Sequence, residues 1–163
     1  MSKTADFTQL ISDNEGALFK VSALYTNDRD SQKDLYQEVV LQLWRSYDQY
    51  EGTAKRSTWL YRVALNTAIS YLRQSKRQRA TVELDAVLPQ LSSEGNELLE
   101  ERLALLQQQI KKLDSLEKGI ILLYLEDRSY DEIAAITGLS PTNVGTKLSR
   151  IKEKLKKQMK REA

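Results

Sequence analysis

The residues of this chain best suited to recognising a ligand are polar and basic side chains near the carboxyl end. In the major groove of DNA, Asn pairs with adenine, and Arg and Lys pair with guanine or bind phosphate. Thr hydroxyls can bond to either base. Several such side chains on the outer faces of one helix predict DNA recognition. The candidate set is Ser140, Thr142, Asn143, Thr146, Lys147 and Arg150.

Two short helices joined by a tight turn must position these side chains, over residues 129–155. Ser129 can cap the first helix, with Glu132 at capping-box spacing, and Gly138 can take the left-handed conformation that ends it. Ser140 caps the second helix and Pro141 occupies its first position. Its buried stripe is expected at Val144, Leu148, Ile151 and Leu155. We interpret the pair as a helix-turn-helix, with an ordinary helical hairpin as the alternative.

Composition argues against catalysis. The 163 residues include no Cys and no His, which removes thiol chemistry, the commonest general base and the commonest neutral metal ligand. An enzyme built on the carboxylates between Glu126 and Glu132 is an alternative. However, Asp131 and Glu132 are explained by the helix start, where acids favour the helix dipole. We therefore expect no enzyme activity, no cofactor and no metal site.

Charges are strongly segregated, although the net charge is only +2. Residues 147–161 hold eight basic residues and one acid, residues 73–79 hold four basic residues, and residues 83–101 hold six acids and no base. This pattern favours a polyanionic partner that contacts the two basic segments. At the extreme carboxyl end, the alternative is that the basic residues form a solvated helix face. The longest apolar run, Ile120 to Leu125, is far too short to cross a membrane, and the amino end has no signal-peptide pattern. We expect a cytoplasmic protein without membrane insertion.

Apolar residues recur at helical spacing almost throughout, which predicts an all-α protein of two small helical domains joined by a flexible linker. Periodicity is lost around Pro89 and the Ser/Gly-containing stretch that follows it. We place the domains at residues 1–76 and 97–163 and the linker at 77–96. The second domain contains the helix-turn-helix, preceded by a helix that Asp114 caps in a capping box with Glu117.

The first domain is predicted to contain helices over 4–12 and 14–24, a longer helix capped by Ser31, and a helix from Thr58. The third helix has an apolar surface wider than one neighbouring helix would cover. From the end of this helix onward, aromatic residues are interleaved with basic ones, a pattern typical of proteins that bind single-stranded nucleic acid. We expect most of these rings in the core and one or two on DNA. They are Trp44, Tyr47, Tyr50, Trp59, Tyr61 and Tyr71.

Taken together, residues from about 14 to 155 resemble an extracytoplasmic-function sigma factor, the compact class of bacterial RNA polymerase sigma subunits. Three motifs in family order carry the resemblance: Asp34-Leu35 with Gln37-Glu38, then Trp59-Leu60-Tyr61-Arg62, then Tyr130-x-Glu132-Ile133-Ala134. At Gly145 the family often carries Lys or Arg, so the resemblance implies one DNA contact fewer here. A stand-alone dimeric helix-turn-helix regulator is the alternative, and it leaves the first domain unexplained.

The resemblance implies a role for each candidate surface. The third helix would dock on the clamp helices of the largest polymerase subunit, through Asp34, Leu35, Gln37, Glu38, Leu41 and Trp44. The following loop and helix would capture a flipped base of the minus-ten promoter element, through Tyr50, Gly52, Lys55, Arg56, Ser57, Arg62 and Asn66. The recognition helix would enter the major groove at the minus-thirty-five element. The resemblance also implies an anti-sigma factor as a partner.

Overall fold

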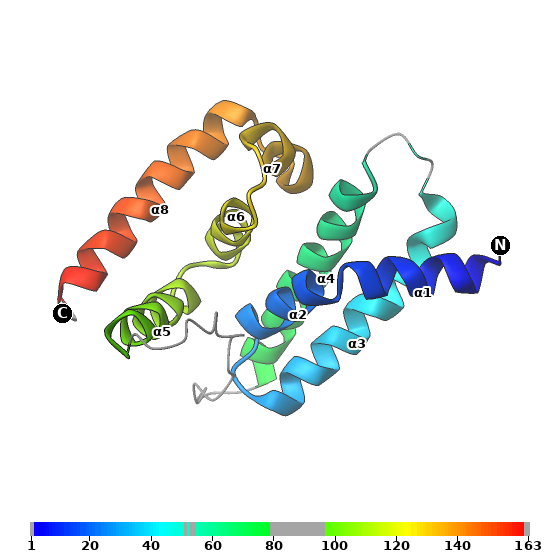
Figure 1. Ribbon diagram of the computed structural model, residues 1–163, viewed down its shortest axis with the longest axis horizontal. Coiled ribbons are helices and arrows are strands. Elements are labelled where there is room, and N and C mark those ends of the chain that lie inside the picture. Colours follow the sequence, from blue (N-terminus) through cyan, green and yellow to red (C-terminus); the bar gives the residue numbers. More distant parts are fainter. Residues whose placement is uncertain (1, 51, 53–54, 79–96, 162–163) are drawn as a thin grey trace. The chain divides into compact units, whose positions relative to one another are not determined.

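The computed structural model describes residues 2–50, 52, 55–78 and 97–161, with residues 76–78 described by their backbone alone. Within these ranges the ordered elements are all helices, which confirms the predicted all-α class (Figure 1). The chain divides into two compact units, residues 1–87 and 88–163. Most of the predicted linker, residues 79–96, lies outside the described residues.

The first unit contains α1 (Lys3–Asp13), α2 (Glu15–Leu24), α3 (Arg29–Ser46), a 3₁₀ helix η1 (Tyr47–Gln49) and α4 (Arg56–Gln78). α3 and α4 lie side by side, and α2 packs on both of them (Figure 1). The buried faces of α2, α3 and α4 pack together to form the core of this unit. The fully buried residues of this core include Leu18, Val21, Leu35, Val39, Leu43, Leu60, Ala64 and Ala68.

The start of α3 differs from the prediction. Asp28, not Ser31, is the N-cap: its carboxylate accepts hydrogen bonds from the Ser31 backbone N–H at 2.7 Å and the Ser31 hydroxyl at 2.9 Å. The two carboxylate oxygens of Asp28 thus engage both donors of Ser31, which sits inside the first turn.

The ends of α4 also lie outside the predicted bounds. The carbonyl of Lys55 accepts a hydrogen bond from the Trp59 N–H at 3.2 Å, so the first turn forms around Arg56, two residues before Thr58. At its other end α4 continues to Gln78. Residues 77–78 therefore belong to α4 and not to the linker.

The second unit contains α5 (Glu97–Lys111), α6 (Ser115–Leu125), α7 (Tyr130–Thr137) and α8 (Pro141–Arg161). α6 packs against α5, α7 and α8, and its residues 118–123 are all buried, as expected for the centre of this unit. The predicted capping box is confirmed: Asp114 accepts from the Glu117 N–H at 2.8 Å, and Glu117 accepts from the Asp114 N–H at 3.2 Å. No helix in the described ranges is long and apolar enough to cross a membrane.

Candidate polymerase and promoter interfaces

The α7–α8 pair has the geometry predicted for a helix-turn-helix. The Ser129 hydroxyl accepts from the Glu132 N–H at 3.1 Å, and Gly138 ends α7 with a φ of 82°. Ser140 then caps α8, since its hydroxyl accepts from the Asn143 N–H at 3.1 Å. The four residues predicted to form the inner stripe of α8 are all buried. Outside this stripe, most residues in the first turns of α8 are exposed.

The candidate base-reading residues lie outside the buried stripe of α8. Thr142, Asn143 and Arg150 are exposed, and Lys147 is half-buried. The Thr146 hydroxyl donates to the Thr142 carbonyl at 3.1 Å, so its proton is already engaged within the helix. Asn143, whose amide group is exposed in the first turn of α8, is therefore the best placed amide for a base contact.

Two of the basic residues farther along α8 have partners within the unit. The Lys154 ammonium lies 3.1 Å from the Glu117 carboxylate. The Lys152 ammonium lies 4.0 Å from the centre of the Tyr124 ring, and its hydrogen bond with Tyr124 raises the lysine pKa. The basic run at the carboxyl end is therefore partly used to fasten α8 to α6.

The candidate minus-ten residues lie in and after the loop that joins η1 to α4. Gly52 has a φ of 74°, a conformation that glycine adopts readily, and Lys55 and Arg56 are exposed. Ser57 is half-buried. Glu51, Thr53 and Ala54 lie outside the described residues.

The aromatic residues around this loop separate into core and surface. Of the six rings expected mostly in the core, Trp59 and Tyr61 are buried, at 9% and 2% exposure, and the other four are half-buried. Tyr50 is half-buried and its ring centre lies 5.3 Å from that of Trp59. Tyr50 is thus the ring at the loop that is best placed to stack on a base.

The outer face of α4 continues from this loop. Arg62 and Asn66 are both exposed and lie one helical turn apart. Asn66 also borders a groove between α3 and α4, so it stands between the loop and the surface predicted to bind polymerase.

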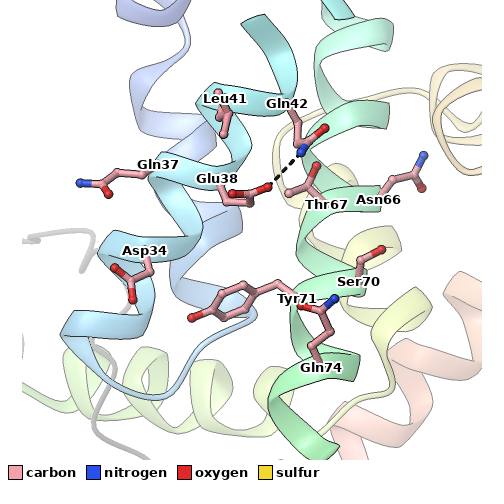
Figure 2. Close-up of a pocket in the computed structure, with 10 residues that line it drawn as sticks. All are labelled: Asp34, Gln37, Glu38, Leu41, Gln42, Asn66, Thr67, Ser70, Tyr71 and Gln74. Atoms are coloured by element: carbon pink, nitrogen blue, oxygen red, sulfur yellow. Dashed lines mark hydrogen bonds between the residues drawn. The ribbon is translucent and has the colours of Figure 1, made fainter. Parts of the chain in front are cut away.

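This groove has a volume of about 830 Å³. Figure 2 shows its lining residues: Asp34, Gln37, Glu38, Leu41 and Gln42 from α3, and Asn66, Thr67, Ser70, Tyr71 and Gln74 from α4. Asp34 and Gln37 are exposed, and Gln37 points away from α4. Leu41 is a large apolar residue that is 39% exposed. Glu38 is half-buried, and one of its oxygens accepts from the Gln42 side chain at 2.9 Å.

Two residues predicted for the polymerase surface are placed differently by the packing. Leu35 is fully buried, so it supports the α3 surface from beneath and presents no side-chain area to a partner. Trp44 is half-buried, with its ring 5.0 Å from that of Phe7 and 4.2 Å from the Lys3 ammonium. The α4 side of the groove was not predicted. The sequence pattern that could have indicated it is a polar row spaced one helical turn apart, Asn66, Ser70 and Gln74.

Comparison with known proteins decides the family. The family model described as Sigma-70 region 2 matches residues 10–78, and the model described as Sigma-70, region 4 matches residues 103–155. This chain belongs to the sigma-70 family and is an extracytoplasmic-function sigma factor. It is a non-catalytic subunit that directs RNA polymerase to promoters and initiates transcription, and the helix-turn-helix of its second unit binds DNA.

Curated relatives agree with this assignment. The chain is 32% identical over 132 residues to the ECF RNA polymerase sigma-E factor of Escherichia coli K12, covering 74% of this sigma factor and 69% of the relative. It is 29% identical over 144 residues to the ECF sigma factor SigW of Bacillus subtilis, covering 78% and 75% respectively.

Two solved structures share the fold. The sigma factor RpoE, in complex with the anti-sigma factor NepR from Bartonella quintana, matches with a TM-score of 0.76 and 22% identity, over 95% of this chain and 97% of that one. CnrH, in complex with the cytosolic domain of CnrY, matches with a TM-score of 0.73 and 20% identity, over 99% and 92%.

Proposed function

We propose that the outer face of α3 is the surface by which this sigma factor docks on the clamp helices of the largest polymerase subunit. Its contact residues are Asp34, Gln37, Glu38 and Leu41. The observation that carries this proposal is the exposed Leu41 in the α3–α4 groove, about one helical turn from the Glu38 carboxylate and two turns from that of Asp34. In such an interface Leu41 would supply an apolar contact and the surrounding polar side chains would form the rim.

The loop from Tyr50 to Ser57 and the outer face of α4 bind the melted non-template strand at the minus-ten element. Extruding a base costs a few kcal/mol, which stacking and hydrogen bonds in the loop must offset. Tyr50 supplies the ring for stacking, and Lys55 and Arg56 attract the phosphates. Arg62 and Asn66 continue the contact along α4, where both side chains are exposed.

α8 reads the minus-thirty-five element from the major groove. Asn143 contacts a base edge near the start of the helix, and Lys147 and Arg150 contact bases or phosphates farther along it. Thr142 and Thr146 lie beside them. Ser140 acts as the helix cap, and its backbone lies at the helix start, where N–H groups favour a phosphate.

An anti-sigma factor regulates this protein. Two sigma factors of the same fold have been solved as complexes with NepR and with the cytosolic domain of CnrY, respectively. The exposed apolar and acidic surface of α3 is available to such a partner. Affinity purification of the tagged sigma factor under several growth conditions tests this proposal. Recovery of polymerase subunits alone under every condition would count against it.

The assignment of the two DNA surfaces is tested by promoter selection. Core polymerase carrying this sigma factor transcribes a library with randomised upstream and downstream elements, and the transcribed sequences are determined. We expect two enriched elements. Asn143→Ala should relax the upstream element alone, whereas Arg56→Ala should weaken use of the downstream element alone. If either substitution altered both elements equally, the separation of the two surfaces would be wrong.

A further inference from the structure

The start of α1 contains a large buried ring that lies before the region matched by the sigma-70 region 2 model. That match begins at residue 10, whereas α1 begins at Lys3. Phe7 lies in this preceding part and is only 8% exposed. An apolar side chain buried so close to the amino end needs packing partners elsewhere in the unit.

Those partners form a line of rings that leads to the minus-ten loop. The Phe7 ring centre lies 5.0 Å from that of Trp44 and 5.5 Å from that of Tyr47, with edge-to-face angles of 70° and 80°. The Tyr47 ring lies 6.2 Å from that of Trp59, and the Trp59 ring lies 5.3 Å from that of Tyr50. The first three contacts are edge-to-face, an arrangement in which rings attract each other beyond simple burial, and the Trp59–Tyr50 pair is tilted at 39°. Phe7 thus connects through two intervening rings to Tyr50.

Polar contacts from α1 reach the same segment. The Lys3 ammonium lies 2.8 Å from an oxygen of Asp48 in η1 and 4.2 Å from the centre of the Trp44 ring. Because both partners of the ion pair are well exposed, the pair contributes little by itself. The main attachment of α1 to the segment before the loop is therefore Phe7.

α1 also borders the segment that follows the loop. A groove of about 430 Å³ has α1 residues on one side and Arg56 and Ser57, at the start of α4, on the other. In Figure 1, α1 crosses the carboxyl end of α3. α1 thus lies against both ends of the loop.

We propose that Phe7 is a positioning residue, and that the first turns of α1 hold the ring of Tyr50, at the start of the minus-ten loop, in place to stack on a base of the melted strand, through the rings of Tyr47 and Trp59. This inference rests on the proposed role of the loop in binding the melted strand. Phe7 itself touches no DNA. Removing its ring leaves Trp44 and Tyr47 without this packing partner and lets the ring of Tyr50 shift.

The test uses holoenzyme assembled with saturating core polymerase and a fluorescent single strand that carries a selected minus-ten sequence. We expect Phe7→Ala to weaken strand binding by about fivefold, as when the Tyr50 ring is no longer held in place, without weakening assembly. Phe19→Ala is the matched control, because Phe19 in α2 is 42% exposed and lies outside the line of rings. It should bind the strand as wild type does. Permanganate reactivity of duplex promoter should fall in parallel with strand binding.

Arg56→Ala distinguishes the positioning role of Phe7 from the strand-binding role of the loop. If Arg56→Ala weakens strand binding and Phe7→Ala does not, the positioning role is wrong and the role of the loop stands. If neither substitution has an effect, the role of the loop is wrong and this inference fails with it. If Phe7→Ala does not fold, Phe7→Leu decides, because Leu keeps the apolar volume but not the ring. Normal assembly with weakened strand binding supports the proposal, and wild-type strand binding overturns it.

Discussion

Gly145 of α8 lies directly against the ring of Tyr130 in α7. A Cβ atom at position 145 would stand 3.4 Å from Tyr130 Cε2, which is at the edge of ordinary contact. The absence of a side chain here lets the ring lie over the start of the recognition helix. The position where a side chain of residue 145 would begin therefore faces the Tyr130 ring of α7.

Gly145→Ala should stabilise the protein by about 0.5–1 kcal/mol, because glycine weakens a helix interior by this amount relative to alanine. Tyr130 is 43% exposed, so its ring can shift by the few tenths of an ångström that a methyl group requires. Thermal unfolding measures the change. In a Tyr130→Ala background the gain should be slightly larger. A loss of stability in both backgrounds would show that the helix depends on glycine for another reason.

Asp114→Ala should destabilise the protein by about 1 kcal/mol, because it removes the side-chain cap of α6 and one half of the capping box. α6 is the buried centre of its unit, so the loss should appear in global unfolding by denaturant. Asp114→Asn is the matched control, since Asn also caps well. Equal losses for the two variants would assign the effect to the charge and not to the cap.

Asn143 and Lys147 should respond differently to truncation. Asn143→Ala should cost about 1–3 kcal/mol at one base pair of the minus-thirty-five element and little elsewhere. If Lys147 contacts a phosphate, Lys147→Ala should weaken binding to all sequences alike. It should also reduce the slope of the logarithm of the binding constant against the logarithm of the salt concentration by about one. Titrations of duplex DNA at several salt concentrations distinguish the two patterns. A uniform loss for Asn143→Ala would remove its assignment as a base contact.

Lys111→Met should raise the unfolding midpoint at neutral pH. Burial lowers the pKa of the Lys111 ammonium group below the ordinary value of 10.5, so folding disfavours its charged form. The cost is fully present below the folded pKa, where both states are charged. It decreases as pH rises through that value and disappears above the unfolded pKa. The advantage of the Met variant should therefore shrink toward high pH. Lys112→Met, at an exposed neighbouring site, should show no such trend.

The helix-turn-helix could be predicted closely because its signals are local. Ser129, Gly138 and Ser140 each act on backbone groups within four residues, so sequence spacing alone indicates the turn. The start of α3 was harder, because Asp28 and Ser31 are both good caps and only the backbone geometry decides between them. Leu35 was placed at the polymerase surface by resemblance, although its spacing with Val39 and Leu43 puts it in the core.

The contact between Phe7 and Tyr47 had no signal in the sequence. The two residues are forty positions apart, and their meeting depends on how α1 packs across the end of α3. The α3–α4 groove likewise needs both helices in place, although the polar row on α4 hinted at a second exposed face. Features that depend on the packing of elements distant in the sequence could not be predicted from the sequence alone.

The docking role of α3 is tested most directly by measuring assembly with core polymerase and minus-thirty-five binding side by side. The variant is Gln37→Ala combined with Glu38→Ala, on the α3 face. The control is Gln9→Ala combined with Asp13→Ala on α1, which removes a comparable amide and carboxylate that are hydrogen-bonded to each other at 2.7 Å. If α3 is the docking surface, the α3 variant should weaken assembly by about tenfold or more, as expected for central interface residues, and leave minus-thirty-five binding by the free protein unchanged. The control should assemble as wild type does. Wild-type assembly by the α3 variant would contradict the assignment of α3 as the polymerase-docking surface.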